Sequence, residues 1–184
     1  MAPTALDPKT ALILIDLQIG IVSYQLAHPI AGVLARARIL ADAFRRHGLP
    51  VVLVNVTGGA PGRTEQPRPA AQRPANWAEL VPELGRQPRD LTATKRTWGV
   101  FASTDLDARL RALGVTQVVV GGVSTSIGVE STARQAFELG YNVTLAVDAM
   151  TDTNAEAHSN SVARIFPRLG ETGTAAEIVA LLPR

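Results

Sequence analysis

Four short apolar runs are the feature that most constrains the fold of this chain. They span residues 11–15, 51–56, 117–123 and 143–147. Runs of this length with almost no polar alternation predict strands that are buried on both faces, as in a parallel sheet. The segments between them are long enough for crossover helices. The alternation therefore predicts an α/β fold, a three-layer, doubly wound, Rossmann-like parallel sheet.

Capping residues and helical periodicity predict the connecting helices. Pro29 and Gly48 bracket an amphipathic segment, as is typical of the start and end of a helix. Further helices are expected over 103–113, 124–139 and 174–182, and from Asp152 or Thr153 to Phe166. A short helical piece is expected at 77–80 and a strand at 91–94. Residues 57–74 are rich in Gly, Pro, Arg and Gln and predict an active-site flap. We expect a single domain over residues 1–184.

Composition excludes several classes of function. The chain is 46% hydrophobic and 18% charged, which is typical of a globular protein. Its net charge is only +2 and its arginines are spread out, so nucleic acid is not an expected partner. No apolar run reaches the length of a membrane span, and the first ten residues do not resemble a signal peptide, so we expect a cytoplasmic protein. There is no cysteine, which excludes disulfides and a thiolate nucleophile.

Polar residues at predicted strand ends form the candidate site, because ligands of such sheets bind beyond the carboxyl ends of the strands. Asp16 follows one apolar run, Asp148 follows another, and Lys95 ends the strand at 91–94. Burial would raise the pKa of Asp16 and a nearby ammonium would lower it, so its carboxyl group is suited to proton exchange. A turn-capping role for Asp16 and a solvated Lys95 are the alternatives.

The segment 121–130 joins a predicted strand to a predicted helix and contains Gly121, Gly122 and Gly128. Its free backbone N–H groups are suited to stabilising a negative oxygen. A tight turn whose glycines relieve crowding is the alternative.

Three longer segments resemble the isochorismatase-like hydrolase superfamily, which includes nicotinamidases, N-carbamoyl-amidohydrolases and isochorismatases. They are ALILIDLQIGIVS, TKRTWGVFASTDLDARLRALGVTQVVVGGVSTSIGVESTARQAFELGYNV and AVDAMTD. The resemblance implies that Asp16 and Lys95 match residues that activate a cysteine in the cysteine hydrolases, and that Gly128 replaces this cysteine. True isochorismatases carry the same glycine and hydrolyse a vinyl ether by acid catalysis. By this resemblance Asp16 is the general acid, Lys95 orients it, and Gly128 leaves room where relatives have sulfur.

The resemblance also implies a set of substrate-binding residues. Tyr24, Trp98 and Phe101 are expected to form an apolar wall, although core packing is equally expected for Phe101. The pocket lining is expected to include Val123, Ser124 and Ile127, with a cis peptide bond between Val123 and Ser124. Arg63 on the flap could pair with an anionic substrate, as could Arg96 or Gln66, but a solvated arginine is the simpler interpretation of Arg63.

No metal or other cofactor is predicted. His28, His47 and His158 lack the short spacing of a metal pair, and residues 55–59 read Asn-Val-Thr-Gly-Gly where nicotinamidase relatives bind zinc. The hydroxyl groups of residues 124–126 could replace the missing nucleophile, but the sequence offers them no evident histidine base.

Two functions follow from these residues. The first is hydrolysis, without a cysteine nucleophile, of an enol ether or a related small anionic metabolite. The alternative is a catalytically silent relative that binds a small molecule or a protein. The resemblance implies a homo-oligomer, either a dimer or a tetramer.

Overall fold

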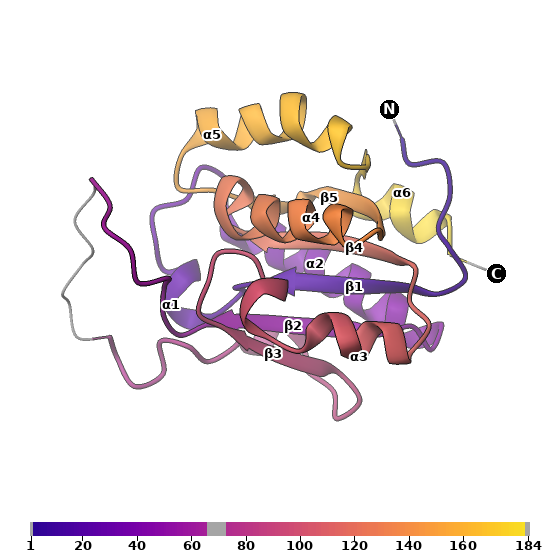
Figure 1. Ribbon diagram of the computed structural model, residues 1–184, viewed down its shortest axis with the longest axis horizontal. Coiled ribbons are helices and arrows are strands. Elements are labelled where there is room, and N and C mark those ends of the chain that lie inside the picture. The colour runs from indigo at the N-terminus through magenta and orange to yellow at the C-terminus, as the bar shows by residue number, and fades with distance from the viewer. Residues whose placement is uncertain (1, 66–72, 183–184) are drawn as a thin grey trace.

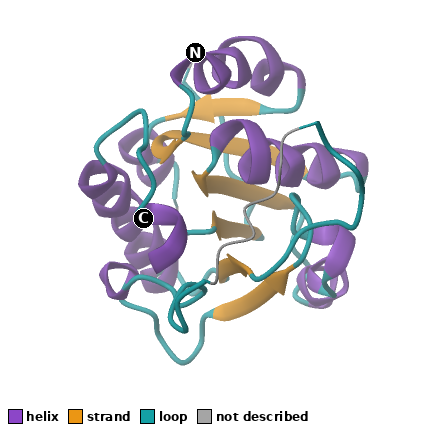
Figure 2. Ribbon diagram, turned by 90° about the vertical axis from the view of Figure 1, so that its left-hand side faces the viewer, coloured by secondary structure: helices purple, strands orange, loops and turns teal. Residues whose placement is uncertain are grey.

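The computed structural model describes residues 2–65 and 73–182 and shows an entirely parallel sheet with helices on both faces (Figures 1 and 2). Its six strands are ordered β3-β2-β1-β4-β5-β6. The strands are β1 (Thr10–Ile15), β2 (Val51–Val56), β3 (Leu91–Lys95), β4 (Gln117–Val123), β5 (Asn142–Thr151) and β6 (Glu171–Gly173). The α-helices are α1 (Ile19–Val22), α2 (Ile30–Arg46), α3 (Leu106–Ala112), α4 (Glu130–Glu138), α5 (Ala155–Asn160) and α6 (Ala175–Ala180). The predicted α/β fold class is confirmed, while the extent of the domain, 1–184, stays a prediction.

Two apolar clusters, one on each face of the sheet, stabilise this arrangement. Every residue of β1 is buried, and alternate side chains enter opposite clusters. Leu12 and Leu14 pack with residues of α2, whereas Ile13 and Ile15 pack with residues of α3 and α4. Fully burying a leucine or isoleucine side chain stabilises the fold by about 1.5–3 kcal/mol. The continuous apolar run at residues 11–15 is therefore explained by a central strand with two buried faces.

Strand β5 is longer than the sequence predicts. From Val120 to Gly122, β4 advances two residues while β5 advances five, from Leu145 to Met150. The strand therefore bulges and then continues to Thr151, so Asp148 does not lie at its end. Asp148 instead accepts hydrogen bonds from Arg36 of α2 and from the backbone of Ala175, the first residue of α6. The expectation that Asp148 ends β5 at the candidate site is wrong.

Several predicted helix boundaries also shift. The predicted helix over 124–139 divides into a π-helical turn, Thr125–Val129, and α4. The helix predicted to be capped by Asp152 or Thr153 is capped one or two residues later, by Asn154, whose side chain accepts a hydrogen bond from the backbone of Ala157. Helix α6 begins where predicted, with a capping box formed by Thr174 and Glu177.

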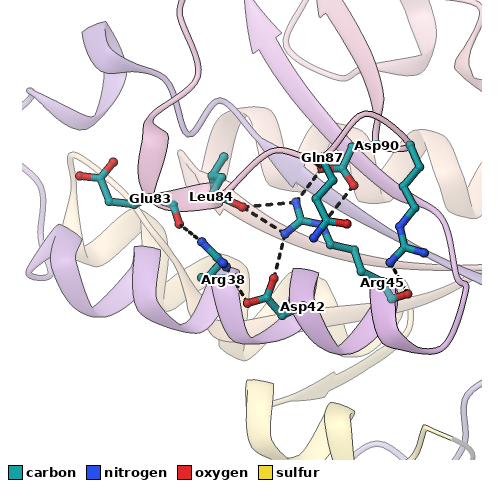
Figure 3. A network of polar contacts seen from close by, with 8 residues as sticks. Arg38, Asp42, Arg45, Glu83, Leu84, Gln87 and Asp90 are labelled. Carbon is teal, nitrogen blue, oxygen red and sulfur yellow. Dashed lines mark hydrogen bonds and ion pairs between the residues drawn. The ribbon is translucent and has the colours of Figure 1, made fainter.

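A buried arginine ties α2 to the segment before β3 (Figure 3). The guanidinium group of Arg45 donates to both carboxylate oxygens of Asp90, at 3.1 and 2.6 Å. It also donates to Asp42 and to the backbone carbonyl group of Leu84. The backbone N–H of Gln87 donates to Asp90 as well. Each charged group of this buried pair therefore has several hydrogen-bond partners, and the pair fixes α2 against residues 82–90.

The segment after β2 projects away from the sheet at the left of Figure 1. Its described part includes Arg63, which is exposed, whereas Gln66 lies outside the described residues. After the gap, the side chain of Gln18 holds the returning chain by donating to the backbone carbonyl group of Trp77, and Gln18 also bonds Val56. No helix among the described residues is long and apolar enough to cross a membrane.

Candidate active site

The side chains of Asp16 and Lys95 meet beyond the carboxyl ends of β1 and β3. Lys95 Nζ lies 2.7 Å from Asp16 Oδ2 and forms a buried ion pair with it. The two residues are 79 positions apart in the chain, and β2 lies between their strands in the sheet. The long lysine side chain spans this distance, and Nζ also donates to the backbone carbonyl group of Thr97. The sheet therefore brings together the two ionisable groups that the sequence places at its strand ends.

Burial dominates the electrostatics of Asp16. Its side chain is only 7% exposed, and burial raises its pKa to about 6 against the opposing effect of Lys95. Asp16 Oδ1 is buried without a hydrogen-bond partner among the described residues. Leaving such an atom unpaired is costly, and groups of this kind are found where function requires them. The Asp16 carboxyl group is therefore suited to exchanging a proton near neutral pH.

The backbone around Asp16 is unusual. Asp16 has a φ of 51°, which is uncommon for a residue other than glycine. Opposite the end of β1, Gly122 has a φ of 123°, and a Cβ atom there would lie 2.1 Å from the carbonyl oxygen of Ile15. Only glycine fits at position 122, because any side chain would collide with β1. The peptide bond between Val123 and Ser124 is cis, as the resemblance implies.

Gly128 lies directly against the carboxyl group of Asp16. A Cβ atom at position 128 would lie 3.3 Å from Asp16 Oδ2 and 2.9 Å from Ile15 Cγ2. The three residues predicted to be catalytic therefore share one location. The second distance shows, however, that Ile15 already occupies part of the space beside Gly128. A cysteine at this position would require Ile15 to move, so the expected free room for a sulfur atom is limited.

The Asp16–Lys95 pair is closed off from solvent. The side chain of Lys95 is 2% exposed, and Gly128 is buried as well. A substrate therefore reaches Asp16 Oδ1 only when neighbouring side chains move.

The predicted binding residues differ in their surroundings. Trp98 and Tyr24 are 65% and 49% exposed, so about half or more of each residue is open to solvent. Ile127 is 36% exposed, whereas Val123 is buried and Ser124 is partly buried.

Two further predicted binding residues have different surroundings: Phe101 packs against the core, and Arg63 lies on the surface. The ring of Phe101 stacks on Tyr141, with 5.9 Å between ring centroids. Tyr141 precedes β5 and belongs to the apolar cluster against which Phe101 packs, so the structure agrees with the core-packing alternative for Phe101. Arg63 belongs to the projecting segment after β2 and is exposed.

Two functional candidates were missed in the sequence. Asp152 accepts hydrogen bonds from the backbone N–H and the hydroxyl group of Ser126, at 2.7 and 2.8 Å. His158 Nδ1 lies 2.8 Å from Thr125 Oγ1, so the expectation that no histidine serves residues 124–126 is wrong. The apolar residues 149–150 beyond Asp148 were the signal that β5 continues and that Asp152 follows its end. Nothing in the local sequence indicates the contact between Thr125 and His158.

The described residues contain no cluster of three or more His, Cys, Asp or Glu side chains suited to a metal ion. Asn55, at the end of β2, is engaged in protein contacts. Its amide group donates to the carbonyl group of Ala78 and accepts from the hydroxyl group of Thr94. Asn55 therefore contributes to the structure of this edge.

Comparison with known proteins agrees with this geometry. Residues 10–177 match the model of the isochorismatase domain. The chain is 44% identical over 178 residues to the uncharacterized isochorismatase family protein YwoC of Bacillus subtilis, covering 93% of each chain. It is 30% identical over 178 residues to the ureidoacrylate amidohydrolase RutB of Stutzerimonas stutzeri, covering 80% of this chain and 72% of RutB. The solved structure of an isochorismatase family protein from Burkholderia thailandensis superposes with a TM-score of 0.94 at 39% identity, covering 99% of each chain.

The parallel α/β sheet and the buried carboxyl–ammonium pair beyond its strand ends agree with these matches, among which RutB is a named hydrolase. This chain belongs to the isochorismatase family, whose members are hydrolases.

Proposed function

We propose that this protein hydrolyses a small anionic metabolite, such as an enol ether, without forming a covalent intermediate. The observation that carries the proposal is the buried Asp16–Lys95 pair beside Gly128 in a chain that has no cysteine. An acid that acts on water and substrate directly does not need a nucleophilic side chain. The retained pair and the absent sulfur therefore fit one mechanism.

In this mechanism Asp16 supplies the proton. The protonated carboxyl group donates to the terminal carbon of the enol ether, and the positive charge moves to the ether carbon and oxygen. Water then adds to that carbon, and the proton that water releases returns to the carboxylate. The resulting hemiketal breaks down to a ketone and an alcohol. Asp16 ends each cycle in the protonated form in which it began.

Lys95 has a positioning and electrostatic role in this proposal. Its ammonium group holds Asp16 Oδ2 at 2.7 Å, which directs the unpartnered Oδ1 away from the lysine. The positive charge also limits the rise in the pKa of Asp16, which burial alone would carry further above about 6. About a tenth of the carboxyl groups then stay protonated at pH 7.

Gly128, Val123, Ser124 and Ile127 would line the substrate space on the β4 side. In this proposal Trp98 and Tyr24, which are 65% and 49% exposed, would close over a bound substrate. We expect cytoplasmic localisation and a homo-oligomer, and both remain part of this proposal.

The test combines a substrate screen with matched variants. Purified protein is assayed against isochorismate and a panel of amides, and then as Asp16→Asn and Lys95→Met. The controls are Asp105→Asn, whose side chain is 75% exposed, and Lys9→Met, which changes the one other lysine of the chain. We expect turnover that both site variants abolish and both controls retain.

A pH profile separates acid from base catalysis. If Asp16 acts as the acid, kcat/KM falls as the pH rises above about 6, because the protonated form is lost. A rise through the same range would instead make Asp16 a base that activates water, as for an amide substrate, and would refute the acid mechanism. Gly128→Ala adds a single carbon atom beside Asp16 Oδ2, and we expect it to lower activity by filling the substrate space.

A catalytically silent binding protein is the second candidate, and the closed site favours it. Lys95 and Asp16 are both nearly inaccessible in the isolated chain, whereas Trp98 is largely exposed. Absence of turnover on every substrate of the panel, together with saturable binding of one of them that Asp16→Asn leaves intact, would support this candidate over hydrolysis.

A further inference from the structure

Two histidines from distant parts of the chain lie side by side near the end of β5. The rings of His28 and His158 have centroids 4.6 Å apart. His28 Nδ1 lies 3.0 Å from Thr151 Oγ1, and His158 Nδ1 lies 2.8 Å from Thr125 Oγ1. Each ring therefore uses Nδ1 to contact a threonine. The Nε2 atoms have no hydrogen-bond partner among the described residues.

These histidines line a surface hollow of about 330 Å³, which also contains Arg36 and Asp148. Its apolar lining includes Val33 and Met150. The volume lies within the range of small-molecule sites, about 300–1,000 Å³. Neither Asp16 nor Lys95 lines this hollow, so it is distinct from the candidate active site.

The acceptors of the hollow are already engaged. Asp148 Oδ2 accepts from Arg36 Nε at 2.9 Å, and Asp148 Oδ1 accepts from the backbone N–H of Ala175 at 2.7 Å. Both carboxylate oxygens therefore have partners, and the carboxylate gives the hollow little further capacity to accept hydrogen bonds.

Donors remain available on the same walls. Arg36 Nη1 donates to the carbonyl group of Gly32, and Nη2 has no hydrogen-bond partner among the described residues. A Cβ atom at Gly32 would lie 3.2 Å from Arg36 Nη1, so the glycine allows the guanidinium group to lie close against α2. Burial, and then the neighbouring His28, lower the pKa of His158, which leaves Arg36 as the main positive charge. A ligand with acceptor oxygens and a negative charge would match these groups.

We propose that this hollow binds a small monocarboxylate with an apolar body, through Arg36 and the histidine pair His28 and His158. The carboxylate accepts from Arg36 Nη2 and from imidazole N–H groups, while the apolar body packs on Val33 and Met150. This site does not depend on the hydrolysis proposed above.

A side-chain contact joins the hollow to the loop of the candidate active site. His158 holds Thr125, which follows Ser124 and the cis peptide bond and precedes Gly128 by three positions. A carboxylate bound at His158 therefore contacts a residue that positions this loop.

Benzoate is a suitable probe, because it joins one carboxylate to one apolar ring, and benzyl alcohol is its uncharged counterpart. Calorimetric titration should give saturable benzoate binding, with benzyl alcohol at least about 10-fold weaker. Arg36→Gln should weaken benzoate binding by about 10- to 100-fold, and Arg36→Lys should restore part of it. Arg38→Gln is the matched control on the same helix, because Arg38 pairs with Asp42 instead.

Four outcomes would overturn the proposal. The first two are no saturable benzoate binding at tens of millimolar and equal binding of benzyl alcohol. The third is an equal loss of benzoate affinity in Arg36→Gln and Arg38→Gln. The fourth is a loss of benzoate affinity in Asp16→Asn that Arg36→Gln does not show. The last result would place benzoate at the Asp16–Lys95 pair. Thermal melting of each variant shows that it is folded at the titration temperature. Amide chemical shifts at residues 28, 32 and 125 should move on addition of benzoate and should move less in Arg36→Gln at the same benzoate concentration.

Discussion

Two buried ion pairs in this protein differ in how many hydrogen-bond partners their charged groups have. Arg45 and Asp90 are joined by two hydrogen bonds, and the carbonyl group of Leu84 and the backbone of Gln87 supply further partners (Figure 3). Asp16 has one hydrogen bond from Lys95 on one oxygen and none on the other among the described residues. The first pair satisfies its buried charges, whereas the second leaves one carboxylate oxygen unpaired. Burial alone therefore does not distinguish the two pairs, but the number of their hydrogen-bond partners does.

The choice of cation agrees with this distinction. Arginine stays charged in proteins and presents several donors in a fixed plane, which suits a permanent structural contact. Lysine has one compact group that gives up its proton more readily when buried. The pair that links α2 to residues 82–90 uses arginine, and the pair beside Gly128 uses one of the two lysines in the chain.

The largest expected difference is in catalysis. Asp16→Asn should lower kcat by about 10²- to 10⁴-fold, because a positioned general acid contributes that much. Asp90→Asn should keep kcat within a few fold at a temperature where it is folded. The measurement is steady-state kinetics on the substrate found by the screen. Similar losses in both variants would remove the functional distinction between the pairs.

The next difference is in stability. Asp90→Ala leaves Arg45 charged and buried without its main partner, so the free energy of unfolding should fall by about 3–5 kcal/mol. Asp16→Ala should lower the free energy of unfolding by less, because Lys95 can become neutral and because a poorly solvated carboxylate is removed. Urea denaturation of the two variants and the wild type measures both values. A larger loss in Asp16→Ala would contradict the assignment of Asp90 as the structural partner.

The pH dependence of stability tests the raised pKa of Asp16. Its pKa rises from 3.8 to about 6 on folding, so the folded state favours the protonated form. This contribution to stability is complete well below pH 3.8 and is lost as the pH rises from there through about 6. The stability of the wild type relative to Asp16→Asn should therefore fall by about 2 kcal/mol between pH 4 and pH 7. A relative gain over the same range would mean that Lys95 outweighs burial.

The smallest expected effect is that of replacing both members of the active-site pair. The free energy of unfolding of the double variant Asp16→Asn/Lys95→Met should lie within about 1 kcal/mol of the wild-type value. A buried ion pair often stabilises the fold no more than a neutral replacement does. The double variant Arg45→Met/Asp90→Asn should lose about 1–3 kcal/mol more of its free energy of unfolding, because the carbonyl group of Leu84 is then left without its partner. Denaturation curves of the two double variants test this. Equal losses in the free energy of unfolding would show that the additional hydrogen-bond partners of Arg45 do not contribute to stability.

Much of this molecule was predictable from local patterns. The apolar runs predicted β1, β2 and β4 residue by residue or nearly so, and Pro29 and Gly48 marked the limits of α2. These features depend on local sequence, because a strand with two buried faces needs a continuous apolar run. The end of β5 was misplaced, because its bulge depends on pairing with β4 rather than on its own residues.

The sequence by itself determined the parallel α/β architecture, the position of Asp16 and Lys95 at strand ends, and the absence of a cysteine nucleophile. Only the tertiary structure decided that Oδ1 of Asp16 is unpaired, that Ile15 crowds Gly128, and that His158 reaches Thr125. The physical reason is the distance along the chain over which each kind of interaction acts. Periodicity and capping act within a few residues, whereas these contacts depend on how elements distant in the chain pack against one another.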